Sequence, residues 1–225
     1  MLYFDPIYIL FIAPGLILGL AATLLLKYWG NEFKSIQSIN HVSGAELVNK
    51  IGTLYNLDIK LNVMQEDFGD NYDTRSNTIT LSNTSAYGSS ITSLAVTAHE
   101  LGHALQYKQK SPLILFRNFL VPIVNIGTNI GYFMIIIGFV LSIIRISELG
   151  LILFSLSTLF TLLTLPIEID ASNKAFIILK QSDILFEDEM VGAKKVLSAA
   201  VLTYVAALLQ SITQVLYFFF RIKRK

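Results

Sequence analysis

Four long stretches without a charged side chain constrain the fold more than any other feature of this sequence. They cover residues 7–26, 120–144, 149–166 and 199–220. About 20 apolar residues in a helix are needed to cross the hydrocarbon core of a bilayer, and each stretch has or approaches that length. The composition agrees, because 53% of the chain is hydrophobic and only 15% is charged. We therefore expect an α-helical multi-pass protein of the cell membrane, with about four transmembrane helices.

The charge and the absent cysteines exclude two kinds of site. The net charge is +1, which gives no general attraction to nucleic acid. We therefore expect the lipid bilayer as the environment of the chain, and no nucleic-acid partner. The chain has no cysteine, so neither a disulfide framework nor a thiolate zinc site is available. Any zinc must be held by histidine and carboxylate.

Between the first and second apolar stretches the chain changes character. Residues 31–110 are polar and contain the patterns of a small α+β domain. Ser43 and Glu46 match a helix capping box. Apolar residues then alternate in 59–63 and again in 79–81, which predicts two short strands joined by the acidic segment 65–77. We accordingly divide the chain into an N-terminal anchor (1–29), this domain (30–112) and a region of three further spans (113–225).

The string His99-Glu100-Leu101-Gly102-His103 lies in a helical pattern near the end of this domain. Residues four apart in a helix lie on one face, so the two imidazoles can bind one Zn²⁺. Glu100 projects to the side, where it can act on a water molecule without being a ligand. Chance occurrence on a solvated helix is the alternative, but two of the three histidines in the chain fall in this apolar string. Gly102 would let another segment approach closely, and Ser89, Ser90 and Thr92 are candidate helix caps.

A catalytic zinc site normally has three protein ligands, so a third must come from elsewhere. Spans two and three carry the chain across the membrane and back, which returns residues 166–192 to the side of the two histidines. Glu168 and Asp170 open this segment. They are two residues apart, about 200° around a helix, so only one of them can face the metal. The spacing alone leaves both open.

The motifs together resemble a family of membrane zinc peptidases. His99–Ala104 is followed by two spans and then by Leu165–Ser172, and the chain continues with Gly192–Leu197 and Leu202–Ala207. This arrangement resembles the YugP-like neutral zinc metallopeptidases of bacteria. Asp70–Arg75 resembles that family's Asp-His-Tyr-Asp-Pro-Arg segment, with Asn and Thr at the second and fifth places.

The resemblance implies a multi-pass zinc peptidase with a zincin-like catalytic domain. More distantly the arrangement is similar to HtpX-type and CAAX-processing peptidases, which take the third ligand from a Glu-x-x-x-Asp segment. This likeness implies Glu168 as the ligand. Asp170 is the alternative ligand, a partner of a ligand histidine or simply a solvated carboxylate. Ser172 stands where the Asp of that segment is expected.

The expected function is hydrolysis of peptide bonds in peptides or membrane proteins, with Zn²⁺ held by His99, His103 and Glu168 and with Glu100 as general base. A non-catalytic zinc-binding scaffold or chaperone-like protein is the alternative. Cleavage within the membrane is disfavoured because 91–107 is only moderately apolar, and transport because no charge lies mid-span. Tyr72, Tyr87 and Tyr204 are candidates to stabilise an oxyanion, although structural packing is the favoured interpretation of each.

Three further features have plainer interpretations. His41 lies in a polar stretch and is expected at the surface. A strand at 77–83 could hold an extended substrate at a sheet edge, although an ordinary sheet strand is the simpler expectation. The basic residues 221–225 favour a cytoplasmic C-terminus, but a similar number of basic residues flanks the histidine side, so the sequence leaves the orientation open.

Overall fold

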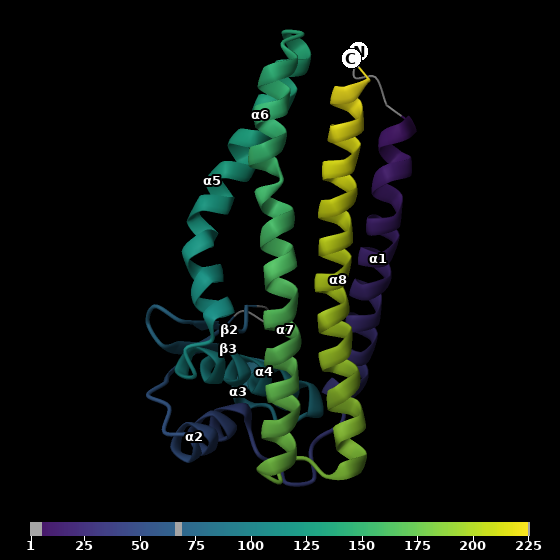
Figure 1. Cartoon of the computed structure of the whole chain (residues 1–225). Coiled ribbons are helices and arrows are strands. Elements are labelled where there is room, and N and C mark those ends of the chain that lie inside the picture. The colour runs from purple at the N-terminus through teal and green to yellow at the C-terminus, as the bar shows by residue number, and fades with distance from the viewer. Residues whose placement is uncertain (1–5, 66–68, 225) are drawn as a thin grey trace. The chain divides into compact units, whose positions relative to one another are not determined.

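The computed structural model describes residues 6–65 and 69–224. The chain forms two compact units, each built from several segments. The first, here called the helical unit, comprises Met1–Ala22, Leu115–Pro166 and Leu202–Lys225. The second, here called the mixed unit, comprises Thr23–Ile114 and Ile167–Val201. Their elements are labelled in Figure 1.

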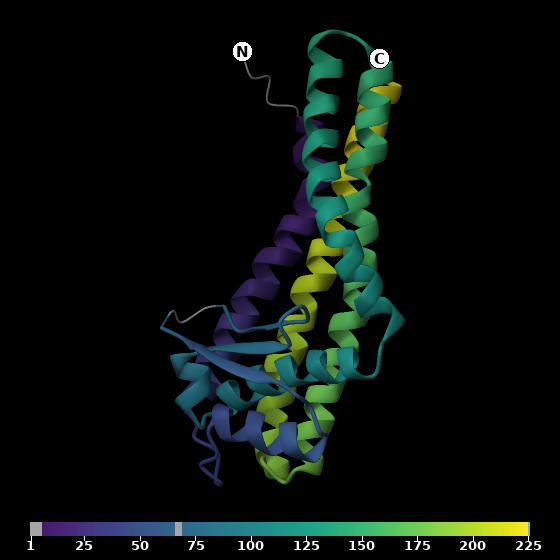
Figure 2. The ribbon, with the colours of Figure 1, turned by 90° about the vertical axis from the view of Figure 1, so that its left-hand side faces the viewer.

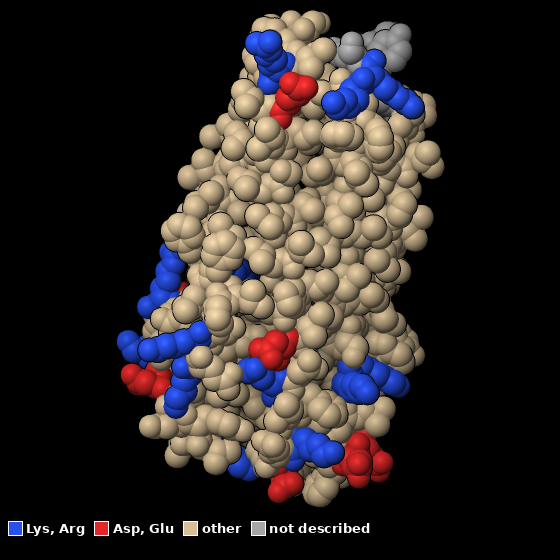
Figure 3. Space-filling model, viewed as in Figure 1, with Lys and Arg blue, Asp and Glu red and all other residues tan. Residues whose placement is uncertain are grey.

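Long helices make up the helical unit and continue into the segments of the mixed unit. They are α1 (Pro6–Lys34), α5 (Pro112–Val140), α6 (Ile144–Phe154), α7 (Leu156–Gln181) and α8 (Glu187–Lys223). Among the described residues, four helical stretches are long and apolar enough to cross a membrane, with α6 and α7 counted as one. This confirms that the chain forms four helical stretches of the length and apolarity that a membrane span needs. On the face in Figure 3, charged side chains of the helical unit lie only toward its ends.

Small and hydroxyl side chains bring the helices of this unit together. A Cβ atom at Gly131 would lie 2.6 Å from the carbonyl oxygen of Gly150, so α5 and α6 are nearly in backbone contact there. The hydroxyls of Thr161 on α7 and Ser211 on α8 are 2.9 Å apart. Close packing and interhelical hydrogen bonds of this kind associate helices in a membrane, where the hydrophobic effect does not.

The mixed unit contains the helix–strand pattern expected from the sequence. Helix α2 (Gly44–Leu54) begins at the predicted capping box, with both Ser43–Glu46 hydrogen bonds formed. Strands β1 (Lys60–Met64) and β3 (Thr78–Ser82) are the two predicted strands. They are followed by the short helix α3 (Asn83–Tyr87) and by α4 (Ile91–Lys108), which carries the two histidines of the His-Glu-x-x-His string.

The sheet corrects two expectations. A third strand, β2 (Asn71–Asp73), lies within the segment expected to be only a connection. The strand order is β1-β3-β2, with β1 parallel and β2 antiparallel to β3. β3 is thus paired on both sides and has no free edge. The expectation that residues 77–83 could hold a substrate at a sheet edge is therefore wrong.

One core spans the mixed unit and places α4 at its centre. Leu94, Ala98 and Leu101 of α4 are fully buried, together with Leu47 of α2 and Ile79 of β3. In Figures 1 and 2, α4 lies between the sheet and α2. The same core includes Phe33, Ile178 and Val196, which come from α1, α7 and α8. Segments far apart in the sequence therefore share the core that holds α4.

Candidate metal site

Helix α4 fixes the two histidines of the motif. It begins at the N-cap Ser90, one of the predicted caps, whose hydroxyl accepts a hydrogen bond from the backbone N–H of Ser93. Leu94, Ala98 and Leu101 bury the opposite side of the helix in the core. His99 and His103 then lie one turn apart on the same face, with their ring centroids 4.8 Å apart.

The third group comes from α7. The Oε2 atom of Glu168 lies 3.1 Å from Nε2 of His99 and 3.5 Å from Nε2 of His103. Two ligand atoms of a tetrahedral zinc ion, each about 2.0–2.1 Å from the metal, lie about 3.3 Å apart. The two observed separations bracket this value, and one atom from each residue falls within 4.8 Å of the others. The donor set of two imidazoles and one carboxylate is one that zinc accepts, so the residues present fit the ion.

Glu168 also determines the electrostatics of its neighbours. Burial lowers the pKa of His103, but the hydrogen bond and negative charge of Glu168 outweigh that effect, so the net shift is upward. The buried carboxylate therefore favours a positive charge next to it. A divalent cation among the same atoms would supply that positive charge.

A glycine lets the two ligand-bearing helices approach. A Cβ atom at Gly102 would lie 2.4 Å from the carbonyl oxygen of Ala171 and 3.2 Å from its Cα. No side chain fits at that distance. The expectation that Gly102 admits another segment beside the metal face is therefore met by α7, the helix that carries Glu168.

Glu100 is buried beside these groups but does not join them. Glu100 is 7% exposed, and its carboxylate forms no hydrogen bond with any residue in the described part of the chain. Burial raises the pKa of Glu100, although the charges of His99 and His103 act in the opposite direction. A raised pKa improves a carboxylate as a proton acceptor near neutral pH. A buried carboxylate without a protein donor also has its lone pairs free for water.

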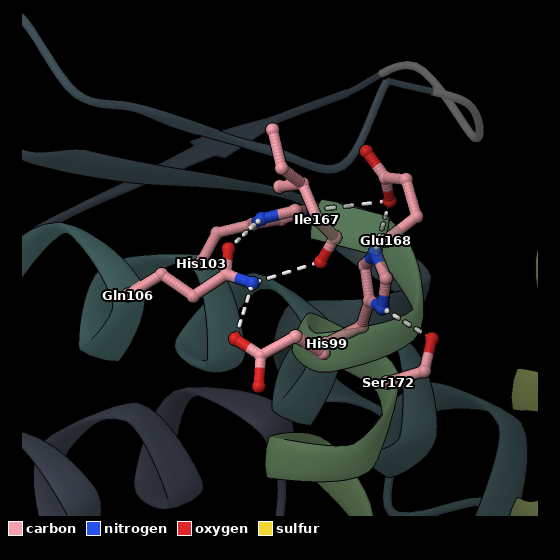
Figure 4. Close-up of polar contacts among 7 residues, drawn as sticks. His99, His103, Gln106, Ile167, Glu168 and Ser172 are labelled. Atoms are coloured by element: carbon pink, nitrogen blue, oxygen red, sulfur yellow. Dashed lines mark hydrogen bonds and ion pairs between the residues drawn. The ribbon is translucent and has the colours of Figure 1, made fainter. Parts of the chain in front are cut away.

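Each histidine is held on the ring nitrogen that faces away from Glu168 (Figure 4). The hydroxyl of Ser172 lies 3.2 Å from Nδ1 of His99, and the amide oxygen of Gln106 lies 3.0 Å from Nδ1 of His103. Partners of this kind orient metal ligands. Gln106 was not predicted from the sequence, although its position one helical turn after His103 was a usable signal.

Asp170 does not point at the histidines. Its Oδ2 accepts a hydrogen bond from the amide of Gln106 at 2.8 Å, and both of its oxygens pair with Lys174. Its expected contact with a ligand histidine is therefore replaced by an indirect one through Gln106. Ser172, which departs from the Glu-x-x-x-Asp pattern, makes the direct contact with His99 instead.

Other residues singled out by sequence lie outside this cluster. The hydroxyl of Tyr72 donates to the side chain of Asn77 at 2.5 Å, and burial raises the pKa of Tyr72 to about 12. Tyr87 is 70% exposed, and His41 is exposed as expected. Tyr204 belongs to the segments of the helical unit. For Tyr72 and Tyr87, packing or surface exposure is the better interpretation.

Comparison with known proteins gives these residues a context. A family model described as "Putative neutral zinc metallopeptidase" matches residues 8–223. The chain belongs to this family. It is 32% identical over 206 residues to "Putative membrane protease YugP" of Bacillus subtilis (strain 168). The aligned residues cover 88% of this chain and 92% of the relative. No solved structure shows a significant match.

Membership of the zinc metallopeptidase family confirms the resemblance noted in the sequence. It implies zinc, and the name of the relative describes that protein as a membrane protease. The geometry of His99, His103 and Glu168 is consistent with that family, since these three residues form a possible metal site.

Proposed function

We propose that this protein is a membrane-bound zinc peptidase that hydrolyses peptide bonds in peptides or membrane proteins. His99, His103 and Glu168 hold the zinc ion, and Glu100 is the general base. One observation carries the proposal: three metal-binding side chains from two helices converge beside a buried carboxylate that has no hydrogen bond within the described chain. A purely structural zinc site would have no use for that carboxylate.

Zinc, when bound, acts as a Lewis acid that acidifies water and polarises the scissile carbonyl. The residues of the chain perform the remaining tasks. Ser172 and Gln106 orient the two imidazoles through their outer nitrogens. Glu100 accepts the proton of the attacking water and delivers it to the leaving amine. Its burial keeps bulk water from competing for that proton.

The location of α4 favours cleavage outside the hydrocarbon core. α4 is fully described by the structure and is not among the four helices that are long and apolar enough to span. In an intramembrane protease the motif helix would itself be such a helix. We therefore propose that substrates reach the site from the aqueous side or from the membrane surface.

The test is a comparison of wild type with Glu100→Gln in purified, detergent-solubilised protein. Both should bind one zinc ion per chain by elemental analysis, because Glu100 is not a ligand. Wild type should cleave an unfolded reporter protein such as casein, and the variant should lose about 100- to 10,000-fold of that activity, which is what removing a general base costs. Glu148→Gln is a matched control, since Glu148 is exposed and lies in α6 of the helical unit.

Two outcomes would overturn the proposal. Cleavage by Glu100→Gln at the wild-type rate would remove the assigned base. Stoichiometric zinc in a wild type that cleaves neither soluble nor membrane proteins would instead support the alternative, a zinc-binding scaffold without catalysis.

A further inference from the structure

Gln106 is the most completely engaged polar side chain near the proposed metal site. It lies three residues after His103 on α4 and is 1% exposed. Its Oε1 is 3.0 Å from Nδ1 of His103, and its Nε2 is 2.8 Å from both the carbonyl oxygen of Ile167 and Oδ2 of Asp170. Figure 4 shows this amide between the histidine and α7.

The orientation of this amide follows from its partners. A backbone carbonyl can only accept hydrogen bonds, so the NH₂ group of Gln106 must face the carbonyl oxygen of Ile167, and Oδ2 of Asp170 lies on the same side of the amide. Its oxygen must then face His103. An amide oxygen only accepts, so Nδ1 of His103 is the nitrogen that carries hydrogen, and in the neutral ring the lone pair is on Nε2. That nitrogen is the one nearest Glu168.

Asp170 is in turn fixed by Lys174, one turn further along α7. Its two oxygens lie 2.8 and 2.9 Å from the ammonium nitrogen. Both oxygens of Asp170 therefore accept from Lys174, and Oδ2 also accepts from the amide of Gln106. The chain of contacts runs from Lys174 through Asp170 and Gln106 to His103.

The contact with Ile167 connects the same amide to the other ligand helix. Ile167 directly precedes Glu168 and follows Pro166, which lies inside α7. The bond from Gln106 therefore fixes the backbone of α7 next to the residue that supplies the carboxylate.

We propose that Gln106 is the positioning residue of the metal site, which selects the Nδ1–H tautomer of His103 and ties α4 to α7 beside Glu168. This inference rests on the proposed function in that it takes His103 and Glu168 as metal ligands. It assigns to Asp170 the task of anchoring Gln106, which excludes it as a ligand.

The test measures metal binding and not cleavage. Gln106→Met keeps the length of the side chain but removes all three hydrogen bonds. The zinc dissociation constant, from competition with a chromogenic chelator, should rise about 10- to 100-fold. The visible spectrum of the Co²⁺-substituted protein should lose intensity and broaden, because His103 is no longer held in one orientation. Gln109→Met is the matched control, since Gln109 is exposed just after the end of the same helix.

A rescue separates positioning from simple packing. Gln106→Glu places a second carboxylate against Asp170 and should weaken zinc binding at least as much as Gln106→Met. In the double variant Gln106→Glu with Asp170→Asn, the amide and acid exchange places, so an N–H···O bond between them and an acceptor for His103 are restored. The bond to the carbonyl oxygen of Ile167 stays lost, because a glutamate at position 106 has no N–H to donate. The double variant should therefore regain part of the affinity that Gln106→Glu loses and shift the Co²⁺ spectrum back toward that of wild type.

A less invasive variant guards against misfolding. Asp170→Ala removes one anchor of Gln106 at a half-exposed position, and it should weaken zinc binding in the same direction by a smaller factor. Wild-type zinc affinity and an unchanged Co²⁺ spectrum in Gln106→Met would overturn the inference. A loss of zinc affinity of more than about 1,000-fold in Asp170→Ala would also overturn it, because a loss of that size is expected only if Asp170 is a ligand. Neither result affects the Glu100→Gln test of the proposed function. If wild type proves to have no peptidase activity, the inference about Gln106 still holds, because it is tested by metal binding.

Discussion

The hydroxyl of Ser172 holds His99 on the side away from Glu168, at 3.2 Å from Nδ1. A neutral hydroxyl orients the ring but adds little to its basicity, whereas a carboxylate in the same place would do both. Ser172 is buried and also lines a cavity of about 400 Å³ between α7 and α8, so a slightly longer side chain has room.

From this geometry we expect Ser172→Asp to bind zinc about tenfold more tightly and Ser172→Ala about tenfold more weakly than wild type. Chelator competition on the purified proteins measures both changes. Ser198→Asp and Ser198→Ala are the controls, because Ser198 lines the same cavity from α8 and is exposed. If Ser172→Asp and Ser198→Asp shift zinc affinity equally, the effect is general electrostatics and the assigned contact is unimportant.

At this scale the sequence predicted which residues meet but not how they are supported. The spacing of His99 and His103 places them on one helical face, and the family resemblance implied Glu168. Ser172 was not predictable as the partner of His99, because which nitrogen of the imidazole faces the carboxylate depends on the path of α7 past α4. That path is a tertiary property, and no local pattern encodes it.

Among the elements, the approach of α4 to α7 depends on a single missing side chain. A methyl group at Gly102 would lie 2.4 Å from the carbonyl oxygen of Ala171, and backbone cannot rotate away as a flexible side chain can. Gly102→Ala should therefore push the helices apart, destabilise the fold by about 1–3 kcal/mol as overpacking does, and weaken zinc binding more than tenfold.

Gly52→Ala is the control for that substitution. Gly52 lies inside α2, and a Cβ atom there would meet nothing closer than the carbonyl oxygen of Leu57 at 3.8 Å. The same change should raise stability by up to about 1 kcal/mol through helix propensity and leave zinc binding unchanged. Thermal unfolding in detergent, with and without zinc, distinguishes the two variants. Equal stability of both would show that α4 and α7 are less closely packed than the structure indicates.

The elements themselves were predictable where local physics is strong. Apolar runs gave the spanning helices, and the Ser43–Glu46 capping box gave the start of α2. Strand β2 was missed because Asn71–Asp73 contains a single apolar residue, so no alternation can be recognised over three positions. It exists because β3 offers it a partner, with Tyr72 opposite Ile79.

For the whole molecule, the structure groups segments that the sequence separates. We divided the chain into consecutive regions, whereas the mixed unit combines Thr23–Ile114 with Ile167–Val201. The amide N–H of Ile39 donates to Glu189 of α8 at 2.8 Å, and the ammonium group of Lys50 donates to the carbonyl oxygen of Ser182. Contacts separated by 130 to 150 residues carry no signal in a single sequence.

The order of the segments nevertheless predicts a topology that can be tested directly. Four spans place the polar segment after the first span and the segment after the third on one side of the membrane, and the turn between α5 and α6 on the other. The chain has no cysteine, so single substitutions introduce unique thiols. Ser76→Cys and Glu187→Cys report on the first side and Ser142→Cys on the second, and all three positions are exposed.

A membrane-impermeant maleimide applied to intact cells should therefore label either the first two variants or the third, but not both groups. Permeabilised cells should label all three, which controls for reactivity. Whichever group reacts in intact cells also gives the orientation that the distribution of basic residues leaves open. Labelling of Ser76→Cys and Glu187→Cys from opposite sides would mean that His99 and Glu168 arise on different faces of the membrane, and a shared metal ion would then be excluded.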